Sequence, residues 1–95
     1  MIVKKHISQG KLILAICDKE LLGKVFEEGK FILDLSSEFY NGEETNEEQL
    51  EGLLKKVYII NAVGKKSVGF LKKNNIIENT NEISNIPYAQ VVIEH

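Results

Sequence analysis

The sequence contains no arginine and no tryptophan, and it has only one cysteine and one proline among its 95 residues. All twelve basic residues are therefore lysines, which excludes bidentate guanidinium contacts to carboxylate, phosphate or guanine. The single cysteine, Cys17, excludes an intrachain disulfide and a zinc site built from several cysteines. Any anion must be bound by ammonium groups, which act as point charges.

Long apolar runs are also absent. No stretch approaches the roughly 20 apolar residues that a membrane-spanning helix needs, and the N-terminal residues 1–6 lack the apolar core of a signal peptide. We therefore expect a cytoplasmic protein with no membrane partner. The length and the 43% content of hydrophobic residues fit a single globular domain over residues 1–95.

The N-terminal residues predict a β-hairpin. Two runs rich in β-branched residues, 2–7 and 12–17, flank a turn in which Gly10 can adopt a positive φ. A two-residue loop at Gln9 and Gly10 sets the register, so that the numbers of paired residues add to 19. Alternation then gives the better core face to Val3, Lys5, Ile7, Leu12, Leu14 and Ile16.

Cys17 and Asp18 together suggest a catalytic interpretation, because a thiol just before a helix start gains reactivity from the helix dipole. The hairpin register argues against it. His6 lies opposite Ile13, roughly 13 Å from Cys17, so the two side chains cannot share a proton or a metal ion. We expect Cys17 to be a small buried hydrophobic residue, and we expect no catalytic residue, metal or cofactor. His95 is the last residue and is expected to be disordered.

The middle of the chain predicts short elements. Asp18 suits the N-cap of one or two helical turns over residues 19–22. Residues 31–35 predict a third strand, and residues 36–42 predict a loop or a single turn that closes on Asn-Gly.

Two main helices are expected. Thr45 and Glu48 form a capping box that opens a helix of about eleven residues. Its apolar stripe consists of Leu50, Leu53, Leu54 and Val57. A second helix is expected from near Ala62 to Asn74. Its inward side consists of Val63, Ser67, Phe70 and Leu71.

Three segments complete the chain. Residues 57–60 fit either a short strand or the end of the first helix, residues 76–85 predict a polar loop, and residues 88–93 alternate as a strand after Pro87. Strands at both ends with helices between them predict an α+β fold. We expect an N-terminal β-hairpin plus further strands in one mixed sheet, with two main helices packed on it.

The net charge of −2 conceals a segregation of charge along the chain. Residues 1–17 carry +3, residues 18–51 carry −8, residues 52–73 carry +6 and residues 74–95 carry −3. Helix dipoles explain much of this pattern, because each acid near a helix N-terminus and each lysine near a C-terminus gains about 0.3–1 kcal/mol. Residues 52–73 contain no acid and are therefore the first candidate for a binding surface.

The dipole does not explain Lys65 and Lys66, which lie near the expected start of the second helix. At 100° per residue, four lysines fall within about 120° of one another: Lys65, Lys66, Lys72 and Lys73. Gly69 lies in the middle of this arc and would let a ligand approach the backbone. A phosphate backbone fits such a surface, and a solvated helical face or a patch for an acidic protein partner are the alternatives.

The leading hypothesis is a non-enzymatic binding module that contacts RNA or a ribonucleoprotein through this lysine-rich helix. The second hypothesis is a small-molecule binder or enzyme with a polar pocket near Asp18, Asn61, Tyr88 and Gln90. A third is a protein-interaction domain, which would expose an apolar patch of several hundred Å² or form an extensive dimer contact.

Several short motifs in order resemble the small archaeal family known as domain of unknown function 424. They are Cys17-Asp18, Leu22-Gly23-Lys24, Phe39-Tyr40 followed by Gly42, Asn61 with Val63-Gly64, and Pro87 with Ala89-Gln90-Val91. The resemblance covers nearly the whole chain and implies an archaeal, cytosolic, stand-alone domain with no assigned activity. Members of this family often carry histidine at the position of Tyr88. This chain departs from that pattern, which argues against a general-base role at this position.

Overall fold

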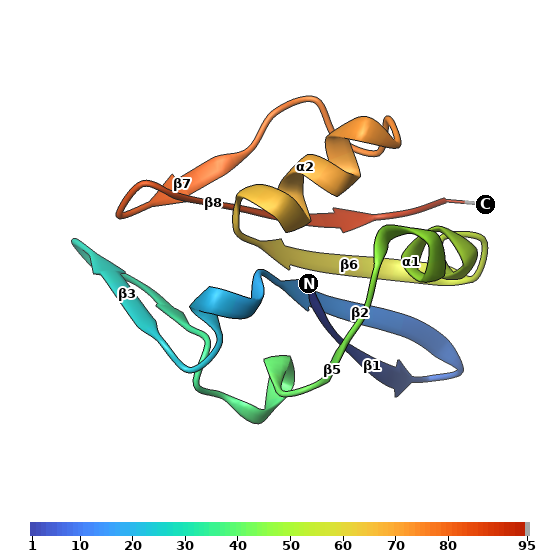
Figure 1. The fold of residues 1–95 in the computed structure, drawn as a ribbon, viewed down its shortest axis with the longest axis horizontal. Helices are drawn as coiled ribbons and strands as arrows, with labels where there is room; N and C mark the ends of the chain where they lie inside the picture. The colour runs from blue at the N-terminus through green and yellow to red at the C-terminus, as the bar shows by residue number, and fades with distance from the viewer. Residues whose placement is uncertain (95) are drawn as a thin grey trace.

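The computed structural model describes residues 1–94, and the α+β fold expected from the sequence is confirmed (Figure 1). His95, for which we expected disorder, lies outside the described residues. The strands are β1 (Ile2–Ser8), β2 (Lys11–Cys17), β3 (Val25–Glu28), β4 (Phe31–Asp34), β5 (Glu43–Glu44), β6 (Val57–Val63), β7 (Asn81–Ile83) and β8 (Ile86–Val92). The helices are the short 3₁₀ turns η1 (Lys19–Leu21) and η2 (Glu38–Tyr40), and α1 (Glu47–Leu53) and α2 (Lys65–Lys73).

Six strands form one mixed sheet in the order β5-β1-β2-β6-β8-β7, and β3 and β4 form a separate antiparallel pair. The predicted hairpin register is confirmed, because Ile2 pairs with Cys17 and His6 pairs with Ile13. Gln9 and Gly10 form the turn with φ angles of 53° and 75°. Within residues 1–94, no helix is long and apolar enough to cross a membrane.

β2 and β6 run parallel at the centre of the sheet, so residues 57–60 belong to a strand. The same pairing shows that the predicted start of the second helix is wrong. Ala62 pairs with Ile16 and the strand continues to Val63, so that α2 begins only at Lys65. Hydrogen bonding to β2 on one side and β8 on the other outweighs the helical periodicity of this segment.

The helix α1 is shorter than predicted, and its predicted N-cap is wrong by one residue. Asn46 is the N-cap, and its side-chain oxygen accepts a hydrogen bond from the backbone N–H of Gln49 at 2.9 Å. The hydroxyl of Thr45 donates to the side chain of Gln49 instead. Asn and Thr both suit this position, so the sequence pattern alone could not fix which of the two adjacent residues caps the helix.

Both main helices pack on one face of the sheet, as expected. The core between the helices and this face contains Val3, Leu14, Ile16, Leu50, Val57, Ile60, Ala62, Val68, Phe70 and Leu71. Ser67, Phe70 and Leu71 of α2 are buried there, as predicted for its inward side. Val63, predicted to lie with them, belongs to β6 instead and packs on the opposite face of the sheet.

The opposite face of the sheet is covered at one end by η1, η2 and the pair β3-β4. A second core forms there around Ile2, Cys17, Leu35 and Val63. Residues 31–34 form a strand as predicted, but they pair with β3 rather than with the main sheet. The β3-β4 pair projects at the left of Figure 1, away from α1. It leaves Phe31 69% and Ile32 65% exposed.

Candidate functional site

The N-terminus of α2 is capped by a side chain from a distant strand end. Asp18 directly follows β2, and its Oδ2 accepts a hydrogen bond from the backbone N–H of Lys66 at 3.0 Å. Its Oδ1 accepts from the backbone N–H and from the hydroxyl of Ser67, each at 2.8 Å. Asp18 is only 3% exposed and Ser67 is fully buried. The carboxylate therefore supplies the negative charge that the positive end of the α2 dipole favours.

This contact corrects the predicted role of Asp18. The residue does occupy the N-cap position of η1, but its side chain makes no hydrogen bond to that turn. The carboxylate caps α2 instead, 48 and 49 residues further along the chain. It also accounts for Lys65 and Lys66 at the helix start, because a buried carboxylate beside them offsets the unfavourable dipole.

Gly64 makes this approach possible. It joins β6 to α2 with a φ of 109°, a conformation that residues with a side chain rarely adopt. A Cβ atom at this position would collide with the carboxyl group of Asp18. The backbone N–H of Gly64 donates to the carbonyl of Pro87 at 2.8 Å, which ties the start of α2 to β8.

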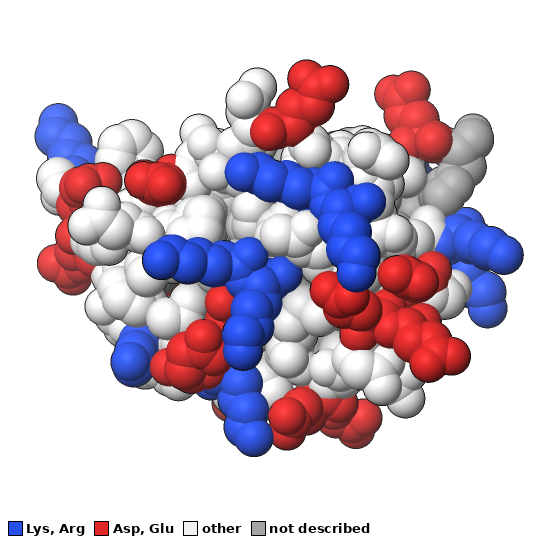
Figure 2. Space-filling view, turned by 45° about the horizontal axis from the view of Figure 1, so that its top comes forward, with Lys and Arg blue, Asp and Glu red and all other residues white. Residues whose placement is uncertain are grey.

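The four predicted lysines lie on the exposed face of α2. Lys65, Lys66, Lys72 and Lys73 are all exposed, and Gly69 between them faces open space. Figure 2 shows lysine side chains gathered across the middle of this face, with acidic side chains along its margins. Lys73 donates to Glu47 of α1 at 3.0 Å, and this hydrogen bond raises the pKa of Lys73 above its usual range. Among residues 1–94, the other three lysines make no ion pair.

A hollow of about 260 Å³, which we call the α2 hollow, opens beside the first turn of α2. Its apolar wall is formed by Leu21, Ile86 and Pro87, from η1 and the start of β8. Asp18 and Gly64 also line it, and Glu20, Lys65 and Lys66 supply its charged side chains. The hollow therefore adjoins the lysine face directly.

The four residues of the predicted polar pocket divide between the two faces of the sheet. Asn61 of β6 and Gln90 of β8 are direct cross-strand partners. Tyr88 lies on the same face of β8 as Gln90, because it is two residues away. Asp18 points to the helix face, where it contacts α2. The fold thus brings Asn61, Tyr88 and Gln90 to one face and leaves Asp18 on the other.

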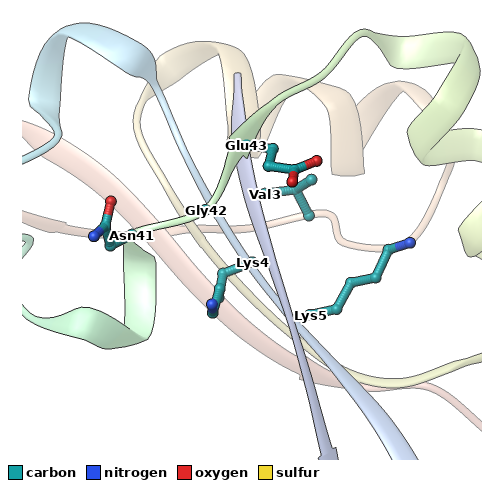
Figure 3. Close-up of a pocket in the computed structure, with 6 residues that line it drawn as sticks. All are labelled: Val3, Lys4, Lys5, Asn41, Gly42 and Glu43. Atoms are coloured by element: carbon teal, nitrogen blue, oxygen red, sulfur yellow. The ribbon is translucent and has the colours of Figure 1, made fainter.

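A larger hollow of about 400 Å³ lies at the edge of the sheet, where β5 meets β1 (Figure 3). β5 pairs only with Ile2 and Val3. Gly42 is in close contact with the backbone of Val3, since a Cβ atom there would collide with the Val3 carbonyl. Lys5 and Glu43 lie on one side of the β1 ribbon and Lys4 lies on the other. The side chains diverge around the edge strand, so this hollow brings no set of groups to a common point.

Residues 6–93 match the family model described as Protein of unknown function (DUF424). The chain belongs to the DUF424 family. The resemblance carried by its short motifs is thereby confirmed. A crystal structure of an uncharacterized conserved protein from Methanopyrus kandleri matches with a TM-score of 0.78 and 21% sequence identity, covering 95% of this chain and 88% of that one. At this identity the likeness shows a shared fold. No curated protein matches the chain.

In this DUF424 chain, Cys17 is fully buried, as predicted. Burial, with a smaller contribution from the adjacent Asp18 carboxylate, raises the pKa of the thiol from 9.0 to about 11. Burial also raises the pKa of Tyr40, with a smaller contribution from Cys17. A thiol with this pKa carries almost no thiolate near neutral pH, so its environment suits packing rather than nucleophilic attack.

His6 also has a structural role in this DUF424 chain. Its ring stacks on Phe39 with centroids 4.5 Å apart, and its Nε2 lies 2.9 Å from the Phe39 carbonyl oxygen. Since a carbonyl only accepts, Nε2 carries the proton. Among residues 1–94, no group of three or more His, Cys, Asp or Glu side chains is placed to hold a metal ion.

The sequence reasoning missed the cap on α2 and the hollow beside it. Both depend on contacts between η1, the start of α2 and the start of β8. One signal of the missing cap was present in the sequence. Two lysines follow Gly64, and no acidic residue lies close to them in the sequence to cap the helix that begins there. The free backbone N–H groups at such a helix start need acceptors, and a side chain from elsewhere in the chain can supply them.

Proposed function

We propose that this protein is an RNA-binding module that holds the phosphate backbone on the exposed face of α2. The observation that carries the proposal is that Lys65, Lys66 and Lys72 share this face and make no ion pair within residues 1–94. Ammonium groups with no carboxylate partner are available to phosphates, and their binding releases counterions from the nucleic acid. No arginine is present, so these contacts are made by ammonium groups acting as point charges.

Two features of α2 support this surface. Asp18 fixes the first turn of the helix, so the backbone that carries Lys65 and Lys66 is held rigidly. Gly69 leaves open space between the two lysine pairs, so a phosphate can approach the helix backbone closely. Lys73 contributes less, because Glu47 already occupies it.

The test is the salt dependence of binding, measured by fluorescence anisotropy with a labelled single-stranded RNA. Three phosphate contacts correspond to a slope of about −2 in log affinity against log salt, or about a twentyfold loss between 50 and 200 mM salt. The double variant Lys65→Glu with Lys66→Glu should reduce the slope to below about 1 in magnitude and weaken binding by tenfold or more.

The matched control is Lys55→Glu with Lys56→Glu, which changes the net charge equally at two exposed, adjacent lysines outside α2. This variant should bind within a few-fold of the wild type. Equal losses in the two double variants would show that binding follows net charge alone. Unchanged binding in the α2 variant would remove the lysine face as the site.

A further inference from the structure

The α2 hollow is too small for a drug-sized ligand and well placed for a single planar group. Its volume of about 260 Å³ lies below the range of roughly 300–1,000 Å³ typical of drug-sized pockets. Leu21, Ile86 and Pro87 give it an apolar wall. A nucleobase has apolar faces that such a wall can contact and polar edges that can reach the rim.

The rim of the hollow combines both charges. Lys65 and Lys66 are exposed and unpaired within residues 1–94, so they can contact the phosphates on either side of an inserted base. Glu20 is an exposed carboxylate at the same hollow. Two cations and one hydrogen-bond acceptor therefore share the rim of the same hollow.

A carboxylate accepts hydrogen bonds and donates none. Cytosine, adenine and guanine carry an exocyclic amino group that can donate to it. Uracil has a carbonyl oxygen at the position of the cytosine amino group, and this oxygen repels a carboxylate; its one ring donor on that edge, N3–H, lies between two carbonyls. A base in a duplex is stacked and paired, so it cannot enter the hollow unless it is first extruded.

We propose that the α2 hollow takes one unstacked, amino-bearing base of single-stranded RNA, while Lys65 and Lys66 contact the flanking phosphates. This inference rests on the proposed RNA-binding function and adds to it a preference for base type and strand state. Glu20 sets the base preference, and the wall of Leu21, Ile86 and Pro87 sets the preference for unpaired RNA.

The experiment compares labelled oligo(C), oligo(U) and a duplex of equal length by fluorescence anisotropy with the full chain. Oligo(C) and oligo(U) have bases of the same size, so the comparison tests the hydrogen-bonding edge, in which an amino group and an acceptor N3 replace a carbonyl and an N3–H. We expect oligo(C) to bind about tenfold more tightly than oligo(U), as one well-formed base contact predicts. The duplex should bind more weakly than oligo(C).

Glu20→Gln tests the role of the carboxylate without disturbing the core, because Glu20 is exposed. An amide can donate as well as accept, so this variant should bind oligo(C) and oligo(U) with similar affinity. Glu38→Gln is the matched control, since Glu38 is an exposed acid in η2 that does not line the hollow. It should keep the wild-type preference.

The outcomes separate the two proposals. Salt-dependent binding with equal affinity for oligo(C), oligo(U) and duplex would overturn the base site and leave the lysine face standing. A preference for oligo(C) that survives Glu20→Gln would also overturn it. Binding that does not depend on salt, or that is unaffected by Lys65→Glu with Lys66→Glu, would overturn the proposed function itself.

Discussion

Replacing Asp18 by alanine should destabilise the fold by about 3 kcal/mol. The substitution removes a helix cap, which costs about 1–2 kcal/mol. It also leaves the backbone N–H and the hydroxyl of the fully buried Ser67 without their acceptor, and a buried unsatisfied donor costs about 1–3 kcal/mol. The N–H of Lys66 is partly accessible, so water can replace its lost partner at little cost. Against a total stability of about 5–15 kcal/mol, this is a large loss.

Urea denaturation followed by circular dichroism measures the effect, with an unchanged m-value as the sign that only stability has changed. Glu20→Ala is the control, because this exposed acid two residues away should change stability by less than about 0.5 kcal/mol. A double-mutant cycle with Ser67→Ala should give a coupling of at least about 1 kcal/mol. A loss below 1 kcal/mol for Asp18→Ala, or additive single effects, would refute the assigned cap.

Two further predictions concern Gly64 and Cys17. Gly64→Ala should cost about 3 kcal/mol, since it adds a collision with the carboxyl of Asp18 to an unfavourable backbone conformation. Gly10→Ala should cost only about 1 kcal/mol, because its φ is also positive but the space around it is open; equal losses in a denaturation assay would contradict the role of Gly64. The pKa of Cys17 is about 11 in the folded state against 9.0 for an ordinary thiol. Between pH 9 and 11 the unfolded state therefore holds fewer protons, and the free energy of unfolding should fall as pH rises, by up to about 1.4 kcal/mol per pH unit. In the variant Cys17→Ala this fall in the free energy of unfolding should be absent. Parallel curves of the free energy of unfolding against pH for the wild type and the variant would exclude the contribution of Cys17.

The register of the N-terminal hairpin could be predicted residue by residue because its determinants are local. Alternation of side chains and a turn that needs positive φ at Gly10 together fix one register. The separation of Cys17 from His6 follows from that register. The burial of the hairpin could not be predicted, because Ile7 of the expected core face is 71% exposed and Ile2 and Cys17 of the other face are buried. The burial of Cys17 depends on the cover of the opposite face by η1, η2 and the β3-β4 pair. The inward side of α2 could also be predicted, because Ser67, Phe70 and Leu71 stand at i, i+3 and i+4 on one helical face.

The remaining features depend on contacts that lie far apart in the sequence. Residues 57–63 have a pattern that suits helix or strand, and only pairing with β2 and β8 decides between them. The partner of residues 31–34 is the four-residue strand β3, which is too short to give a periodic signal. The sequence pattern places Asp18 at the start of the nearest helical turn, because its contact with α2 joins residues that are 48 and 49 positions apart.

The edge of the sheet at β1 has a consequence for aggregation. β5 pairs with only Ile2 and Val3, so the outer side of the strand beyond them can accept a strand from another molecule. Ile7, which is 71% exposed, would favour such pairing. Lys4 and Lys5 stand at the start of this open stretch and put two positive charges on the edge strand. Charged side chains on an open edge disfavour the addition of a further strand, so these lysines oppose the joining of copies edge to edge.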